Sequence, residues 1–187
     1  MKNTFLFNKN SHFNLANLFT FINIISGLSA LFFINNGNYI IAIILAWIGG
    51  FFDIFDGKIS RKFKLSNEFG IQLDSYADFI TFVLVPVSLI QSSILENEYN
   101  NLILNLSFII SITYIVSGIR RLITFNIKSK VGKVDKYFTG IPTPLGAIIL
   151  LLIYISYIFN ILNVYLTLLL IIITSYLLNS KIKIKHP

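Results

Sequence analysis

The sequence predicts an all-α integral membrane protein, a bundle of about six transmembrane helices with both ends of the chain in the cytoplasm. Of its 187 residues, 55% are hydrophobic and only 12% are charged, and the mean hydropathy is +0.76. These values lie well beyond those of a soluble globular domain. Six apolar runs of about 20 residues are long enough to cross ~30 Å of hydrocarbon. The basic residues gather between alternate runs.

Short connections separate the six apolar runs. Because no connection is rich enough in Pro, Gly or Ser to be a domain linker, residues 1–187 are predicted to form one domain. The residues before the first run lack the apolar core and cleavage site of a signal peptide, so this run is predicted to be retained as a helix. The tight turn 160–163 fits a helical hairpin, although the last two runs also fit one broken segment. The runs lie at 15–34, 39–55, 71–95, 102–125, 144–159 and 162–178.

Charge placement orients the bundle. All 15 Lys and Arg residues fall at the N-terminus, in residues 57–70, in residues 120–136 or in the C-terminal tail. Since basic connections stay in the cytoplasm, these four places are predicted to be cytoplasmic parts of a multi-pass plasma-membrane protein. The bases flank membrane segments, so the net charge of +7 indicates attraction to anionic lipid headgroups and not to nucleic acid.

Four aspartates interrupt the apolar pattern. Asp53 and Asp56 share one face at the cytoplasmic end of the second helix, and Asp74 and Asp78 share one face at the start of the third. Even on a lenient scale, a carboxylate at the centre of the membrane costs about 2.5–3.5 kcal/mol unless it is neutralised. The chain has no cysteine, so oxygen ligands and hard divalent cations such as Mg²⁺, Mn²⁺ or Ca²⁺ are the best match.

Four carboxylates can hold two cations a few ångströms apart, an arrangement that clamps the attacking and leaving oxygens in phosphoryl transfer. Gly57 and Gly70 let a phosphate approach the backbone, and Arg61 offers a planar donor fork for it. Two alternatives remain. The acids can be helix-end residues paired with local bases, or they can line the path of a cation transporter. The position of all four near one membrane face favours the enzyme.

The stretch 53–78 resembles the signature of the CDP-alcohol phosphatidyltransferases, D-x-x-D-G-x-x-A-R-x(8)-G-x-x-x-D-x-x-x-D. Every spacing is intact, and the single departure is Ser60, where the family usually has Ala. The resemblance implies a membrane enzyme of six helices that binds a CDP-lipid or CDP-alcohol and two divalent cations, Mg²⁺ or Mn²⁺. By that resemblance Asp78 is both a metal ligand and the general base that takes the proton of the attacking hydroxyl. The other implied metal ligands are Asp53, Asp56 and Asp74.

Three more stretches resemble the membrane-integral phosphatidylserine synthases of this family. They are FGIQLDSYADFITF at 69–82, GIPTP at 140–144, and RLITFN at 121–126, where Thr124 replaces an arginine of their R-L-A-R-F-N. In the first helix, Asn17, Thr20 and Asn23 recur on one stripe with Gly27. Such a stripe either joins helices or, as in the family, lines the nucleotide site.

The resemblance therefore implies transfer of the phosphatidyl group to the hydroxyl of L-serine, with release of CMP. The donor is CDP-diacylglycerol, or CDP-archaeol if the source is archaeal. Glycerol phosphate and inositol phosphate remain alternative acceptors, and members of the family are often homodimers. Candidates for binding serine or a lipid phosphate are Arg120, Arg121 and Lys136, although Arg120 equally fits a snorkelling anchor. The implied CDP-lipid contacts are Asn17, Thr20, Asn23, Gly57, Ser60, Arg61, Asn67 and Gly70.

Overall fold

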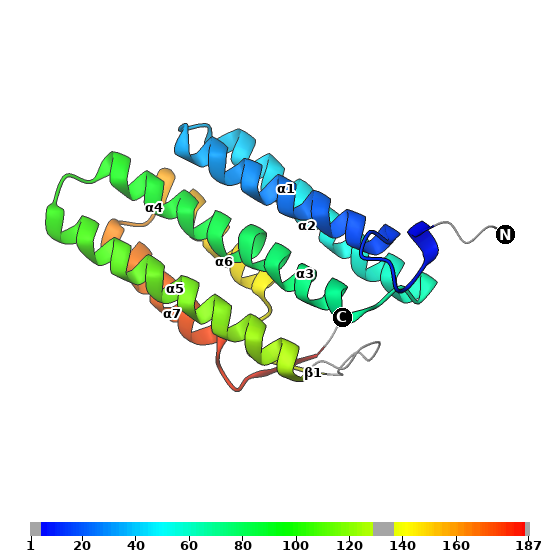
Figure 1. Cartoon of the computed structure of the whole chain (residues 1–187). Helices are drawn as coiled ribbons and strands as arrows, with labels where there is room; N and C mark the ends of the chain where they lie inside the picture. Colours follow the sequence, from blue (N-terminus) through cyan, green and yellow to red (C-terminus); the bar gives the residue numbers. More distant parts are fainter. Residues whose placement is uncertain (1–4, 129–136, 186–187) are drawn as a thin grey trace.

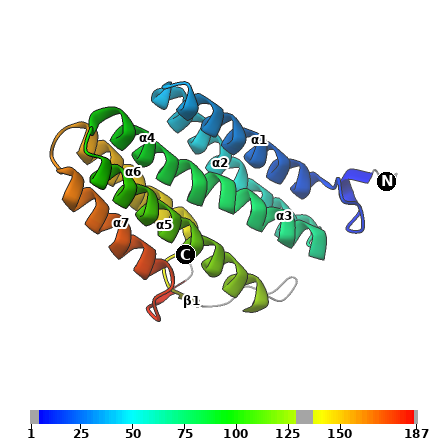
Figure 2. The same cartoon turned by 60° about the vertical axis from the view of Figure 1, so that its left-hand side comes forward.

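The computed structural model describes residues 5–128 and 137–185, which form a bundle of helices (Figure 1, Figure 2). A short 3₁₀ turn, η1 (Phe5–Phe7), precedes the first helix. A π-helical turn, η2 (Phe79–Leu84), joins α3 to α4, and the three form one rod. The α-helices are α1 (Leu15–Asn35), α2 (Tyr39–Phe63), α3 (Glu68–Asp78), α4 (Val85–Asn97), α5 (Asn101–Lys128), α6 (Thr143–Ile158) and α7 (Val164–Leu178).

The predicted helical membrane bundle is confirmed. Among residues 5–128 and 137–185, four stretches are long and apolar enough to cross a membrane: α1, α2, the α3–η2–α4 rod of 30 residues, and α5. The apolar helices α6 and α7 are shorter, at 16 and 15 residues. They are separate helices that pack on each other, so the hairpin prediction for the last two runs is confirmed. Large apolar side chains on the outside of α1, α2 and α5 are exposed, as expected where lipid is the solvent.

The second helix extends two turns further than predicted. We expected it to end near residue 55, but α2 continues to Phe63. It ends where Lys64 adopts the left-handed conformation, with φ of 54°, and the N–H of Leu65 donates to the carbonyl of Ser60 at 2.9 Å. The hydropathy signal stops at the charged residues, whereas Lys, Arg and Ser remain compatible with a helix. The predicted connection 57–70 therefore shrinks to residues 64–67, which brings α3 back beside α2.

The π-helical turn η2 follows Asp78 directly. Its wide geometry is defined by the N–H of Val85, which donates to the carbonyl of Ile80 five residues earlier. Pro86 stands in the next turn. Because the ring of a proline clashes with the carbonyl four residues before it in a regular α-helix, a widened turn relieves this contact. The sequence did not predict this change of register within its third helix.

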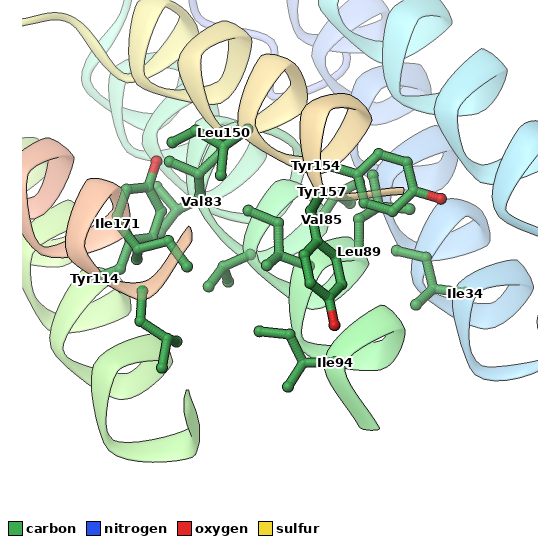
Figure 3. Packing of buried hydrophobic residues seen from close by; sticks show 14 of the residues in the cluster. Ile34, Val83, Val85, Leu89, Ile94, Tyr114, Leu150, Tyr154, Tyr157 and Ile171 are labelled. Atoms are coloured by element: carbon green, nitrogen blue, oxygen red, sulfur yellow. The ribbon is translucent and has the colours of Figure 1, made fainter. Parts of the chain in front are cut away.

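The hydrophobic core lies among α4, α5, α6 and α7, with contributions from α1, α2 and η2. Figure 3 shows Tyr114 and Ile171 on one side of this core, and Tyr154 and Tyr157 on the other. Leu89 of α4 is almost fully buried among them. This core holds the rod in the middle of the bundle, and the acid-bearing α3 continues from it.

A pair of short strands lies at the same end of the bundle as η1 (Figure 1). Strand β1 (Tyr137–Thr139) pairs antiparallel with β2 (Lys183–Lys185). Next to them, the N–H of Gly140 donates to the carbonyl of Ile182 at 2.8 Å. The sequence did not predict this pairing, which ties the segment before α6 to the segment after α7.

Candidate active site

Three of the predicted aspartates lie together where α2 and α3 face each other. One carboxylate oxygen from each of Asp53, Asp56 and Asp74 lies within 4.8 Å of the others. Asp56 is buried, while Asp53 and Asp74 are partly buried. Asp78 is next to this group, and its carboxyl group interacts with that of Asp53. The i, i+3 and i, i+4 spacings place each pair of aspartates on one helix face. The short connection between α2 and α3 then brings the two faces together.

The polar stripe of α1 contacts the acids. The hydroxyl of Thr20 donates to Oδ2 of Asp56 at 2.6 Å, and Nδ2 of Asn23 donates to Oδ1 of Asp53 at 3.3 Å. Thr20 and Asn23 are buried between α1 and α2. Since almost no water reaches these positions, each hydrogen bond orients a carboxylate that would otherwise turn freely. The stripe thus joins the helices through the acids themselves.

A small polar pocket of about 100 Å³ opens beside Asp56 and Asp74. Among the predicted CDP-lipid contacts, Asn23 is not part of its lining and lies instead between Asp53 and Thr81. Arg61 is exposed on the next turn of α2, with its guanidinium near Gly57. The predicted contacts that do line the pocket are Asn17, Thr20, Gly57, Ser60, Asn67 and Gly70.

The size of Gly70 is required by two amide side chains. A Cβ at this position would lie 2.7 Å from Oδ1 of Asn17 and 3.1 Å from Oδ1 of Asn67. Asn67 caps α3, because its Oδ1 accepts the N–H of Gly70 at 2.7 Å. The other ends of both amides bind the segment before α1: Asn67 donates to the carbonyl of Lys9 at 2.7 Å and Asn17 to that of His12 at 2.9 Å. We did not predict from the sequence that two residues of the pocket lining hold the segment before α1.

An apolar groove of about 950 Å³ reaches the acids from the other side. It runs between α2, the η2–α4 part of the rod, and α6, and Asp53 is the one charged residue among the described residues that line it. Its walls are otherwise nearly all apolar and include Trp47, Phe51, Phe82, Pro86 and Ile148. The acid cluster therefore lies between a polar pocket and an apolar groove.

A second set of polar residues surrounds Asp78. The hydroxyl of Thr143, at the start of α6, donates to Oδ2 of Asp78 at 3.3 Å. Arg121 of α5 is only 6% exposed, interacts electrostatically with Asp78, and donates from Nε to the carbonyl of Ile141 at 3.1 Å. The Ser75 hydroxyl donates to Oδ1 of Asn126 at 3.0 Å, which links α3 to α5.

The remaining candidates lie apart from this group or outside the described residues. Arg120 is exposed, and Lys136 belongs to the stretch that the structure does not describe. Thr124, at the position of the expected second arginine, donates its hydroxyl to the carbonyl of Arg120 within the same helix. We did not single out Ser75, Asn126 or Thr143 from the sequence, although they lie inside the motifs DSYAD, RLITFN and GIPTP, respectively. The contact between Ser75 and Asn126 spans 51 residues of the chain, and the contact between Thr143 and Asp78 spans 65.

The donor atoms of the acid cluster fit a hard divalent cation. The close group contains carboxylate oxygens from three aspartates and offers no nitrogen or sulfur ligand. Such oxygen-only sites suit Mg²⁺, Mn²⁺ and Ca²⁺. The cluster can therefore bind divalent metal, with Thr20 and Asn23 holding two of its ligands in place.

Comparison with known proteins places this site in a family. The sequence model of the CDP-alcohol phosphatidyltransferases matches residues 13–177, and this range includes all four aspartates. The chain belongs to this family. The predicted family is thus confirmed, and the acid cluster of this CDP-alcohol phosphatidyltransferase coincides with the signature that the sequence carries at 53–78.

Several characterised members of the CDP-alcohol phosphatidyltransferase family are similar to this chain. It is 33% identical over 175 residues to the CDP-diacylglycerol–serine O-phosphatidyltransferase of Bacillus subtilis, and this match covers 90% of the present chain and 88% of the relative. It is 32% identical over 136 residues to the enzyme of that name from Methanocaldococcus jannaschii (73% of this chain, 58% of the relative). It is 31% identical over 136 residues to the archaetidylserine synthase of Methanothermobacter thermautotrophicus (72% and 54%). The matches thus span little more than half of the two archaeal relatives.

Proposed function

We propose that this protein transfers the phosphatidyl group of a CDP-lipid to the hydroxyl of L-serine and releases CMP. The observation that carries the proposal is the group formed by Asp53, Asp56 and Asp74, which lies between a polar pocket and an apolar groove. Serine is supported as the acceptor by relatives from bacteria and archaea that are named for serine transfer or for archaetidylserine synthesis. The donor is CDP-diacylglycerol or CDP-archaeol, which carry the same reacting phosphate.

The two cavities match the two halves of such a donor. The polar pocket, with Gly57, Ser60 and Asn67 in its lining, receives the phosphate end of the nucleotide, and the exposed Arg61 approaches it from the cytoplasmic side. The apolar groove receives the lipid tails, which enter it from the hydrocarbon of the bilayer and so gain packing contacts without leaving an apolar surrounding. Because Asp53 lines the groove while Asp56 and Asp74 line the pocket, a lipid that occupies both lays its pyrophosphate across the acids.

Two divalent cations, Mg²⁺ or Mn²⁺, complete the proposed site. Asp53, Asp56, Asp74 and Asp78 are the residues that would hold them. When bound, such cations neutralise the charge of the pyrophosphate and the charge that develops on the leaving CMP. Without a counter-charge the same acids would repel a pyrophosphate, so the protein side chains alone do not account for donor binding.

The proton of serine goes to Asp78. In the proposed reaction the carboxylate of Asp78 accepts the proton as the serine oxygen attacks the phosphorus that bears the lipid. The new bond joins this phosphorus to the serine oxygen, and the bond to the phosphate of CMP breaks. Thr143 donates a hydrogen bond to Oδ2 of Asp78 and so fixes the orientation of the carboxylate. We assign the binding of the serine carboxylate to Arg121, which is buried and interacts electrostatically with Asp78.

The proposed site faces the cytoplasm of a multi-pass plasma-membrane protein. The connection after α2 and the end of α2 carry Lys58, Arg61, Lys62 and Lys64, which is typical of cytoplasmic segments. Glu96 and Glu98 lie at the other end of the rod. Serine and CMP then exchange with the cytoplasm while the lipid stays in the bilayer. We also expect a homodimer, which the mass of the purified protein in detergent will test.

An acceptor competition assay tests the proposed function. Purified protein in mixed micelles receives CDP-diacylglycerol, Mg²⁺ or Mn²⁺, and either labelled serine or labelled glycerol 3-phosphate. We expect labelled lipid and stoichiometric CMP with serine, no product with glycerol 3-phosphate, and no product after chelation of the metal. A greater rate with glycerol 3-phosphate would overturn serine as the acceptor.

The variant Asp78→Asn tests the base. Removing a general base lowers the rate by roughly 10²–10⁴-fold, while the amide retains the size of the carboxyl group. We therefore expect Asp78→Asn to lose transfer and to keep the elution profile of the folded protein. Full transfer activity in this variant would show that another group accepts the proton.

A further inference from the structure

We propose that Thr81, on the π-helical turn η2, positions the metal-binding carboxylate of Asp53 through the side chain of Asn23. The hydroxyl of Thr81 donates to Oδ1 of Asn23 at 2.7 Å, and Nδ2 of Asn23 donates to Oδ1 of Asp53 at 3.3 Å. Thr81 and Asn23 are 2% and 0% exposed. The inference rests on the proposed metal site, and it makes Thr81 a residue that positions a metal-binding carboxylate without binding the metal itself.

The relay fixes which end of the Asn23 amide faces the acid. An asparagine has one acceptor end and one donor end. When the hydroxyl of Thr81 occupies the oxygen, the NH₂ group faces Asp53 and its hydrogen bond is charge-assisted. The opposite orientation would place the amide oxygen against a carboxylate. Without the hydroxyl at position 81, only the contact with Asp53 itself selects between the two orientations, and the amide oxygen of Asn23 loses its donor.

The close packing of three helices leaves room for the relay and for little else. A Cβ at Gly27 of α1 would lie 2.6 Å from Oγ1 of Thr81. A Cβ at Gly49 of α2 would lie 2.8 Å from Oδ1 of Asn23 and 3.1 Å from Cγ2 of Thr81. These two buried glycines thus form a slot around the two side chains. Because water cannot enter to replace a lost hydrogen bond, the relay has no substitute within the bundle.

Asp53 needs such support more than Asp56 and Asp78 do. Asp56 receives its hydrogen bond directly from Thr20, and Asp78 receives one from Thr143. Asp53 is the acid that borders the apolar groove, where few polar groups can restrain it. The relay holds its Oδ1 from the α1 side, which keeps the carboxylate beside Asp56 and Asp74 and prevents it from turning along the groove.

Direct metal binding tests the relay without relying on catalysis. Mn²⁺ binding to the purified, substrate-free protein is measured by electron paramagnetic resonance for the wild type, Thr81→Val and Thr81→Ser. Valine keeps the size of threonine but loses the hydroxyl, whereas serine keeps the hydroxyl. Since loss of an outer hydrogen-bond partner typically weakens metal binding by about 10–100-fold, we expect that loss for Thr81→Val and a change below about threefold for Thr81→Ser.

A matched control separates the relay from the general cost of removing a buried hydroxyl. Thr174 of α7 is 2% exposed, and its hydroxyl donates only to the carbonyl of Leu170 in its own helix. We expect Thr174→Val to bind Mn²⁺ as the wild type does. If Thr81→Val unfolds more easily, Thr81→Ala repeats the test with no added methyl group in the slot, and each melting temperature is measured without metal.

A double-mutant cycle tests whether Thr81 acts through Asn23. We expect Asn23→Ala to weaken Mn²⁺ binding, and Thr81→Val to add less than about twofold in that background because coupled residues are not additive. Three results would overturn the relay and leave the proposed metal site standing. They are wild-type affinity for Mn²⁺ in Thr81→Val, equal losses of Mn²⁺ affinity in Thr81→Val and Thr81→Ser, and fully additive losses when Thr81→Val is combined with Asn23→Ala. A wild-type protein that binds no Mn²⁺ would contradict the proposed metal site, and the relay would fall with it.

Discussion

Replacing Asp74 by Asn is predicted to stabilise the metal-free protein and to remove its response to metal. The oxygens of Asp53, Asp56 and Asp74 lie within 4.8 Å of one another, so Asp74 faces two like charges when no cation is present. The substitution Asp74→Asn removes one charge and keeps the shape of the side chain. It also leaves in place the hydrogen bonds that α1 donates to Asp53 and Asp56.

The magnitude follows from the separation of the charges. The three oxygens lie within 4.8 Å of one another, and two unit charges at that limit repel by about 3 kcal/mol at an effective dielectric constant of about 20. Asp53 and Asp74 are partly exposed, and solvent screens part of this repulsion, so we expect a gain of about 1–3 kcal/mol. For a chain of this length the melting temperature then rises by roughly 3–10 °C.

The metal response of this variant changes in the opposite direction. A cation at 100 times its dissociation constant stabilises the folded wild type by about 2.7 kcal/mol, and a hundredfold loss of affinity reduces this to about 0.4 kcal/mol. Melting curves in detergent, with and without Mg²⁺, measure both effects. Glu68→Gln is the control, because Glu68 is an exposed acid on the same helix, and we expect it to keep the wild-type metal response. A lower metal-free melting temperature in Asp74→Asn, or an undiminished metal response, would refute the reasoning.

Two further substitutions test the acceptor side and the turn before α6. Arg121→Lys loses the planar fork of donors and the hydrogen bond from Nε to the carbonyl of Ile141. We expect kcat/KM for serine to fall by about 10–100-fold, mainly through a higher KM. A parallel loss of Mn²⁺ binding would instead indicate a structural role for Arg121. Gly140 has φ of +79°, and a Cβ there would overlap the carbonyl oxygen of Leu178. Gly140→Ala should therefore lower the melting temperature more than Gly37→Ala, where φ is +71° and the space is open. At both positions the left-handed backbone conformation costs an alanine about 1–2 kcal/mol. At Gly140 the steric overlap adds about 1–3 kcal/mol. Equal shifts in these two variants would contradict the packing argument.

The sequence predicted the helices and the acid cluster because both depend on local spacing. Apolar runs define the spans, and the intervals Asp53–Asp56 and Asp74–Asp78 place each pair on one helix face. A short connection then leaves few ways to arrange α2 and α3. The family signature pointed to the same residues, so predicting the acid cluster required little knowledge of the tertiary structure.

The parts that the sequence did not predict depend on contacts between distant residues. Thr143 meets Asp78 across 65 positions of the chain, and Asn23 meets Thr81 across 58. No periodicity relates such pairs, and threonine in an apolar helix commonly bonds its own backbone, as Thr174 does here. The end of α2 was misplaced for a different reason, because hydropathy reports where lipid ends and not where helical hydrogen bonding ends.

The π-helical turn shows how packing far from the acids sets their geometry. A π-turn is wider than an α-turn, so neighbouring helices must make room for it. Here α1 contributes Gly27 and α2 contributes Gly49, while a Cβ at Gly118 of α5 would lie 2.6 Å from Cγ1 of Val83. Three helices thus bring a glycine against one six-residue turn. Because η2 lies between α3 and α4, its register determines how the face that carries Asp74 and Asp78 is rotated relative to the buried face of α4. A larger side chain at Gly118 would therefore act on the acids through this rotation, although it contacts none of them.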